Sequence, residues 1–121
     1  MNFGKWQAWI KRAFWLALAV TLVMALLPKP PALPMQATDK VQHMAAFAAL
    51  TSLAALGFSG LRLRAIFVWM AALGLAIEVL QMIPMLHREA QASDWLADCA
   101  ATAVTLLLWG AVRRLLRRQQ A

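Results

Sequence analysis

Three ionisable side chains stand inside apolar stretches of this sequence, where a charge is expensive: His43, Glu78 and Asp98. A charged side chain at the centre of a transmembrane helix costs at least about 2.5 to 3.5 kcal/mol on insertion scales, so such groups usually face a protein interior and serve a function. A histidine near two carboxylates can act as a general acid and a general base. We therefore treat these three residues as candidate catalytic residues.

Further polar side chains lie three or four residues from each of the three, so each pair shares one face of a helix: Asp39 with His43, Glu78 with Gln81, and Asp94 with Asp98. We expect Asp94 to join the catalytic group. The expected ligand-binding residues are Gln81, Arg88, Asp39 and Lys40, with Arg88 as an anion ligand. Helix capping by Asp39 and Asp94, and contact with lipid headgroups by Lys40 and Arg88, stay open as alternatives.

The same donors allow other roles. Carboxylate oxygens suit a hard divalent cation, and histidine with carboxylates suits zinc, so a divalent metal is an alternative cofactor, although we assign no metal ligand. The structural alternative is a polar clamp, in which His43, Glu78 and Asp98 only form hydrogen bonds that hold the helices together. Such hydrogen bonds average only about 0.6 kcal/mol in membranes. His87 and Glu89 are expected to be solvated loop residues.

The elements that position these groups are apolar. Of the 121 residues, 63% are hydrophobic and 14% are charged, with a mean hydropathy of +0.64. An ordinary soluble domain is about 45–50% apolar and about 25% charged. The single cysteine, Cys99, excludes an intramolecular disulfide, and its apolar surroundings indicate an inert thiol.

Four apolar stretches approach the roughly 20 residues that a helix needs to cross a bilayer. They predict an all-α membrane protein, a single domain over residues 1–121 that forms a bundle of four transmembrane helices with approximate spans 9–27, 41–59, 65–84 and 93–112. Only helices and closed barrels satisfy their backbone in lipid, and no stretch alternates like a barrel strand. A cleaved signal peptide in place of the first helix is the less favoured alternative.

Local signals predict where the helices begin and end. Thr38 or Asp39 is expected to cap the second helix and Ser93 the fourth. Pro84 is expected to close the third helix. The break after the second helix is expected at Ser59 and Gly60, and the fourth helix is expected to terminate at its arginines: Arg113, Arg114, Arg117 and Arg118.

Charge sets the orientation. Cytoplasmic loops are rich in Lys and Arg, and with the N-terminus inside, nine cations lie on the inner side: Lys5, Lys11, Arg12, Arg62, Arg64, Arg113, Arg114, Arg117 and Arg118. The outer side keeps only Lys29, Lys40 and Arg88. We therefore expect a multi-pass protein of the inner (plasma) membrane with both termini cytoplasmic. Trp6, Trp9, Trp69 and Trp109 then form an inner aromatic belt, with Trp95 at the outer interface.

In this topology every acidic residue and both histidines lie toward the outer face. With a rise of 1.5 Å per residue, Glu78 lies about 9 Å and Asp98 about 7 Å below the outer helix ends, and His43 roughly one turn below. Small residues at four-residue spacing are expected to let the helices approach closely: Ala45, Ala49, Ala72, Ala76, Ala97 and Ala101. The candidate residues should therefore converge on one polar cavity.

The order and spacing of these residues resemble the VanZ-like family, across residues 39–101: Asp39-Lys40-x-x-His43, Glu78-x-x-Gln81, Arg88 and Ser93-Asp94-x-x-x-Asp98. The family consists of small multi-helix membrane proteins named for a protein linked to teicoplanin resistance. The resemblance implies a membrane topology and a candidate site, but no reaction. Two departures stand out: many members carry Asn at the position of Asp98, and members often have glycines where this chain has Ala101 and Thr105.

These observations leave three hypotheses for function. The first is an enzyme that modifies an anionic envelope lipid or lipid-linked phosphate by acid–base or metal-assisted chemistry. The second is an accessory protein that recognises such a lipid and alters access of glycopeptide antibiotics. The third is a membrane scaffold with a structural clamp. The net charge of +7 does not indicate nucleic-acid binding, because the cations cluster at the ends of apolar runs. The bilayer is the expected partner, and the sequence sets no oligomeric state.

Overall fold

The computed structural model describes residues 3–26, 36–83 and 92–120, and four α-helices account for nearly all of them. They are α1 (Phe3–Leu26), α2 (Gln36–Gly57), α3 (Leu63–Gln81) and α4 (Ala92–Gln120). The predicted all-α class and number of helices are confirmed. A short turn after Gly57 joins α2 to α3, and hydrogen bonds from Phe58 N to Ala54 O (2.9 Å) and from Leu61 N to Phe58 O (2.9 Å) tighten it.

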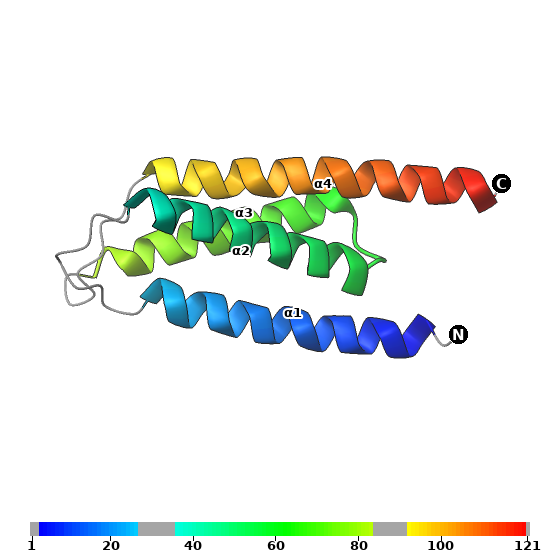
Figure 1. The fold of residues 1–121 in the computed structure, drawn as a ribbon, viewed down its shortest axis with the longest axis horizontal. Helices are drawn as coiled ribbons and strands as arrows, with labels where there is room; N and C mark the ends of the chain where they lie inside the picture. The colour runs from blue at the N-terminus through cyan, green and yellow to red at the C-terminus, as the bar shows by residue number, and fades with distance from the viewer. Residues whose placement is uncertain (1–2, 27–35, 84–91, 121) are drawn as a thin grey trace.

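The helices run side by side as an elongated bundle, with α2 and α3 between α1 and α4 (Figure 1). Both ends of the chain and the turn between α2 and α3 lie at one end of the bundle. The C-terminal end of α3 and the N-terminal end of α4 lie at the other. Helix α2 packs against α1 and α4, and α3 also contacts both outer helices. We call the end that carries the termini the terminal end, and the opposite one the carboxylate end.

Three helical segments are long and apolar enough to cross a membrane: Gly4–Leu26, Leu63–Gln81 and Ser93–Gln119. The apolar segment of α2, Val41–Gly57, is shorter. Large apolar side chains are exposed on every helix, for example Val20, Val41, Val68 and Leu107. A soluble monomer rarely exposes large contiguous apolar patches. The chain is therefore a membrane protein.

Several predicted helix limits are wrong. Helix α2 begins at Gln36, so Thr38 and Asp39 lie inside its first turn and neither is its N-cap. Ser93 likewise lies inside α4, which begins at Ala92. Capping signals fail here because several polar residues near each helix start could serve, and the sequence does not rank them.

The fourth helix does not terminate at its arginines. It continues to Gln120 over 29 residues, with Arg117 and Arg118 in its last turn. Arginine, leucine and glutamine are all good helix formers, and neither proline nor glycine interrupts the segment after Gly110. Cations near a helix C-terminus also interact favourably with the helix dipole. The arginines therefore mark the end of the apolar stretch rather than the end of the helix.

The core follows one face of each helix. Phe47, Leu50 and Ala54 contribute from α2, and Ile66, Met70 and Ile77 from α3, all at helical spacing. Four of the six small residues expected at the helix contacts are exposed instead: Ala45 and Ala49 of α2, and Ala72 and Ala76 of α3. That prediction was wrong because spacing defines a face, and only the positions of neighbouring helices decide which face packs.

Contacts at both ends fasten α1 to the bundle. At the terminal end, Gln7 Nε2 donates to Ser59 Oγ (2.6 Å), and the Phe14 and Phe58 rings pack edge to face with centroids 5.6 Å apart. At the carboxylate end, Gln81 Nε2 donates to the carbonyl oxygen of Ala25 (2.9 Å). The first helix is thus tied to α2 and α3 along its length.

Candidate functional site

The buried face of α3 ends in polar residues. Ile66, Met70, Gly74 and Ile77 lie on this face, and Glu78 continues it toward the carboxylate end. The Glu78 side chain is only 7% exposed, and it lies three residues, or about 4.5 Å, before the end of the helix. A carboxylate here is shielded from lipid by the neighbouring helices. The expectation that Glu78 faces the protein interior is confirmed.

Helix α4 places a second carboxyl group at the same end. Asp98 is 2% exposed and lies on the buried face of α4 with Thr102 and Leu106, which follow at four-residue spacing. The Asp98 carboxyl group interacts electrostatically with those of Glu78 and Asp94. The structure therefore brings together three of the predicted catalytic residues, two of them buried.

Asp98 is incompletely satisfied. Its Oδ1 atom is buried and accepts no hydrogen bond from the residues that the structure describes. Its backbone carbonyl accepts a hydrogen bond from Thr102 Oγ1 (2.9 Å), a bond within α4 that leaves the carboxyl group untouched. A buried polar atom without a partner costs about 1–3 kcal/mol. Asp98 Oδ1 is therefore a candidate proton acceptor within the bundle.

His43 lies on the packed side of α2. It is half-buried and precedes Phe47 by four residues and Thr51 by eight, and both of these are buried. Residues at this spacing share one helix face. His43 therefore lies on the packed face of α2, and its predicted convergence with Glu78 and Asp98 stays a prediction.

Gln81 is also buried, but its amide has a structural partner. The side chain is 3% exposed, and its Nε2 atom bonds to the Ala25 carbonyl of α1. We predicted a ligand-binding residue at this position. In the described contact, the Gln81 amide instead donates to a carbonyl of α1. This bond joins α3 to α1 at the carboxylate end.

The Trp95 side chain joins α4 to α3 near the carboxylate end. Trp95 Nε1 donates to the Ala71 carbonyl (3.0 Å), so the ring crosses from α4 to α3. A Cβ atom built on Gly74 would lie 3.2 Å from Trp95 Cδ1 and 3.4 Å from Phe47 Cζ, so glycine permits this approach. Trp95 is thus half-buried between helices, and its expected place at the outer membrane interface stays a prediction. The polar N–H found a carbonyl in the bundle instead of water.

No protein-family model, curated protein or solved structure matches the chain. The site must therefore be interpreted from its own chemistry.

The described donors do not make a metal centre. Within residues 3–26, 36–83 and 92–120, no three His, Cys, Asp or Glu side chains lie close enough together to hold a metal ion. We derive no step through a metal.

Several predicted residues fall outside this description. Arg88, His87 and Glu89 lie in the segment 84–91, outside the described residues. Asp39 and Lys40 belong to the first turns of α2, but their side chains are likewise outside the description. The ligand-binding roles predicted for Arg88, Asp39 and Lys40 stay predictions, as do the solvated positions expected for His87 and Glu89.

One residue of this region, Thr51, was not singled out from the sequence, and the contact of Trp95 with α3 was not foreseen. Thr51 is completely buried, and its Oγ1 atom bonds to none of the described residues. Trp95 forms the hydrogen bond from α4 to the Ala71 carbonyl described above. The four-residue spacing of His43, Phe47 and Thr51 could have identified Thr51, whereas the orientation of Trp95 depends on the absence of a side chain at Gly74 in another helix.

Proposed function

We propose that this chain is an inner-membrane protein of the VanZ-like type, in which an outward-facing carboxylate site acts on or recognises an anionic envelope lipid or lipid-linked precursor. The observation that carries the proposal is the burial of Glu78 and Asp98, within electrostatic reach of one another, at one end of an apolar bundle. Ionisable groups placed inside membrane helices usually serve a function.

The proposed topology has four transmembrane helices with both termini cytoplasmic. Helix α2 has 22 residues and is about 33 Å long, enough for a hydrocarbon core of about 30 Å. The terminal end carries the exposed cations of α1, α3 and α4, and the positive-inside rule assigns such an end to the cytoplasm. The carboxylate end then faces the periplasm or the exterior.

The proposed chemistry is proton exchange. One carboxyl group of the pair donates a proton to a leaving oxygen, and the other accepts one from an attacking hydroxyl group or water. Asp98 Oδ1, buried and without a hydrogen-bond partner among the described residues, is the proposed proton acceptor. Arg88 remains the proposed anion ligand.

A structural clamp is the second candidate. It is favoured by the bonds from Gln81 to Ala25 and from Trp95 to Ala71, which join helices beside the carboxyl groups. In that case the polar residues hold the bundle together and do no chemistry. An accessory protein that binds the lipid without reaction would use the same residues.

Expression of the chain and its variants in a glycopeptide-susceptible bacterium separates these functions. The measurements are the inhibitory concentration of teicoplanin and the melting temperature of the protein in detergent. If the site is catalytic, Glu78→Gln and Asp98→Asn keep the size of the side chain, preserve the melting temperature, and abolish the change in susceptibility, since general acid–base groups contribute about 10²- to 10⁴-fold. Thr102→Val, a buried change one turn from Asp98, is the control and should retain activity.

Other results support the alternatives. A clamp predicts that Glu78→Gln is tolerated and that Glu78→Ala lowers the melting temperature. Binding without reaction predicts that Arg88→Ala is the most damaging change and Glu78→Gln is mild. A wild-type chain that leaves susceptibility unchanged contradicts the link to resistance.

A further inference from the structure

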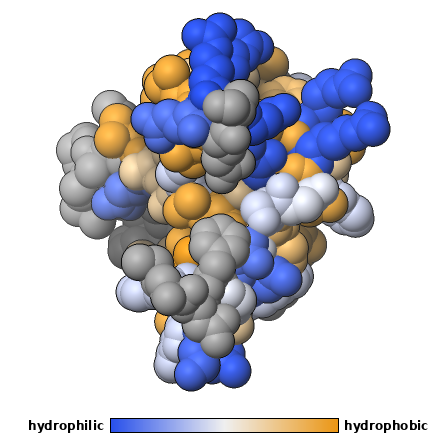
Figure 2. Space-filling model, turned by 90° about the vertical axis from the view of Figure 1, so that its right-hand side faces the viewer, coloured by the Kyte–Doolittle hydropathy of each residue, from blue (hydrophilic) through white to orange (hydrophobic). Residues whose placement is uncertain are grey.

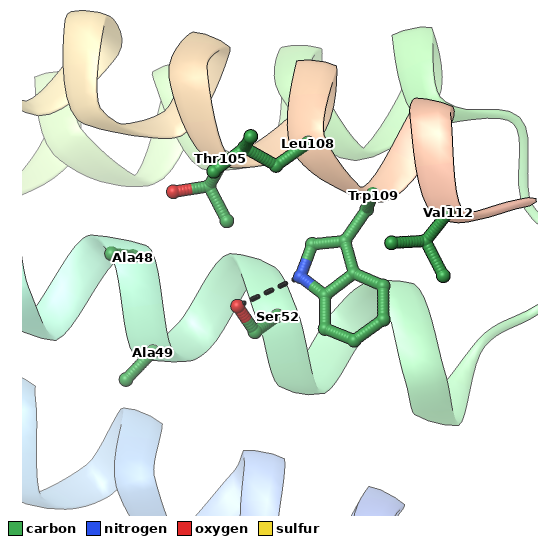
Figure 3. Close-up of a pocket in the computed structure, with 7 residues that line it drawn as sticks. All are labelled: Ala48, Ala49, Ser52, Thr105, Leu108, Trp109 and Val112. Atoms are coloured by element: carbon green, nitrogen blue, oxygen red, sulfur yellow. Dashed lines mark hydrogen bonds between the residues drawn. The ribbon is translucent and has the colours of Figure 1, made fainter.

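The two flanks of α4 differ toward the terminal end. On the flank that faces α2, a groove of about 450 Å³ lies between the helices, and Trp109 of its lining donates from Nε1 to Ser52 Oγ (2.9 Å), as Figure 3 shows. Arg113, four residues after Trp109, donates to the carbonyl oxygens of Ala55 (2.8 Å) and Leu61 (3.2 Å). The cation that follows this groove is thus already engaged within the protein.

On its other flank, α4 lies against the start of α3. A Cβ atom built on Gly110 would lie 3.3 Å from Leu63 Cδ1, so these two residues are in register. Helices α3 and α4 run antiparallel (Figure 1). The residues after Gly110 and those before Leu63 therefore both extend toward the terminal end.

Helix α3 exposes one stripe of residues beside this contact. Arg64, Val68 and Leu75 follow one another at spacings of four and seven residues, so they share one face of the helix. At about 100° per residue, this face lies on one side of Leu63, and the buried Ile66 lies on the other. Val68 and Leu75 are exposed. In a membrane protein their side chains meet lipid.

Helix α4 repeats this arrangement. Leu107 and Arg114 are exposed and seven residues apart, so they too share a stripe. Trp109 faces α2 and Gly110 faces α3, and the stripe lies beyond Gly110 on the side away from Trp109. Arg118 continues it four residues after Arg114. An apolar surface on this flank thus leads directly to exposed arginines.

Both stripes lie on the outer side of the α3–α4 contact, away from the core. We call them together the α3–α4 surface, which consists of Arg64, Val68, Leu75, Leu107 and Arg114.

The two arginines of this surface lean toward each other. Arg64 follows Leu63 by one residue and Arg114 follows Gly110 by four, so in antiparallel helices they are about 7.5 Å apart along the axis. Every Cα–Cβ bond of a helix tilts toward its N-terminus. Arg64 therefore tilts toward the terminal end, and Arg114 tilts away from it. Two guanidinium groups placed in this way can bind one phosphate between them, and the guanidinium group matches phosphate geometry.

The positive charge of this region has no nearby acidic partner among the described residues. Figure 2 views the terminal end, and hydrophilic side chains gather at the top of this view, over α4. The described acidic side chains, Glu78, Asp94 and Asp98, lie toward the opposite end of the bundle. Cations immediately beyond a transmembrane segment attract anionic headgroups, and each contributes about fivefold to binding. The compensating charge must therefore come from outside the described chain.

We infer that the α3–α4 surface binds an anionic phospholipid, with its phosphate between Arg64 and Arg114 and an acyl chain along Val68, Leu75 and Leu107. Leu75 lies eleven residues, or about 16 Å, from Arg64, which matches the depth of about 15 Å of one leaflet. Two parallel copies packed through this surface would bring their arginines together, which is unfavourable. This site is separate from the carboxylate site and does not depend on its function.

Native mass spectrometry of the purified protein in detergent tests the inference, with phosphatidylglycerol and phosphatidylcholine of identical acyl chains as probes. The wild type should retain phosphatidylglycerol about 25-fold better, or fivefold for each arginine. Arg64→Gln with Arg114→Gln should abolish this preference. Lys5→Gln with Arg12→Gln is the matched control. It removes two exposed cations from the same end of the bundle, but from α1, and should keep the preference.

A competition experiment tests the role of the acyl chain. Glycerol phosphate, which carries the anion without hydrocarbon, should not displace phosphatidylglycerol at tenfold excess. Melting temperatures check that each variant is folded, and Arg114→Gln alone, with an expected fivefold loss, replaces the double variant if that is not.

Equal retention of the two lipids by the wild type overturns the inference. An equal loss in the α1 control also overturns it, because the end of the bundle would then attract anions without a defined site. Displacement by glycerol phosphate would show that the anion alone is bound. A dimer that Leu107→Arg dissociates would show that a second copy covers the α3–α4 surface.

Discussion

The two ends of the bundle treat ionisable side chains in opposite ways. At the carboxylate end, Glu78 and Asp98 are buried against neighbouring helices. At the terminal end, Arg114, Arg117 and Arg118 are exposed. Long cationic side chains can lie along apolar surface and extend their charge to the headgroups. Carboxylates have short side chains and cannot, so a carboxylate at membrane depth must be sheltered by protein. The difference indicates that the carboxylate end is built as a protein interior and the terminal end as a membrane interface.

The largest expected effect compares one substitution in the packed middle of the bundle with one at the terminal end. Phe47→Ala should lower the free energy of unfolding by about 3–5 kcal/mol, because Phe47 is almost fully buried beside Gly74. Phe58→Ala should cost less than half as much, because Phe58 is only partly buried. Titration with a denaturing detergent measures both. Equal losses would contradict the contrast between a packed and an interfacial end.

Substitutions at two glycines test the same difference in packing. Gly74→Leu must displace Trp95 and Phe47 and should cost about 1–3 kcal/mol in stability, as overpacking of a core does. Gly60→Leu lies in the turn of the terminal end, where a Cβ atom meets nothing within 4 Å, and should change stability by less than about 0.5 kcal/mol. Melting temperatures of the two variants in one detergent provide the comparison. A Gly74→Leu protein as stable as the wild type would show that the carboxylate end is loosely packed.

The third comparison concerns the hydrogen bonds between helices, where we expect the smallest difference between the two ends. Gln81→Met removes the buried bond to the Ala25 carbonyl and should cost about 1–3 kcal/mol, because that oxygen loses its partner away from water. Arg113→Met removes two bonds, but the one to Leu61 is exposed, and water can replace it. We expect Gln81→Met to lower the free energy of unfolding at least as much as Arg113→Met does. Denaturation in detergent measures both losses. A larger loss of stability for Arg113→Met would contradict the expectation that the buried bond at the carboxylate end contributes more than the bonds at the terminal end.

Much of the fold follows from the sequence, because hydropathy and length identify apolar helices without tertiary information. The burial of Glu78 and Asp98 follows too, since a carboxylate in an apolar stretch needs shelter. The limit of α4 was missed because arginines signal an interface and not a helix stop. The exposed alanine rows and the inward Trp95 were missed for another reason: both depend on which helix faces are adjacent. That information is spread over the whole chain.

The bonds of Arg113 have a consequence for biogenesis. The turn between α2 and α3 is completed by a side chain of α4, which is synthesised after it and donates to the carbonyls of Ala55 and Leu61. While the first three helices leave the ribosome, these carbonyls have no such donor. The hairpin can thus insert early, but it acquires its final cross-link only when α4 arrives.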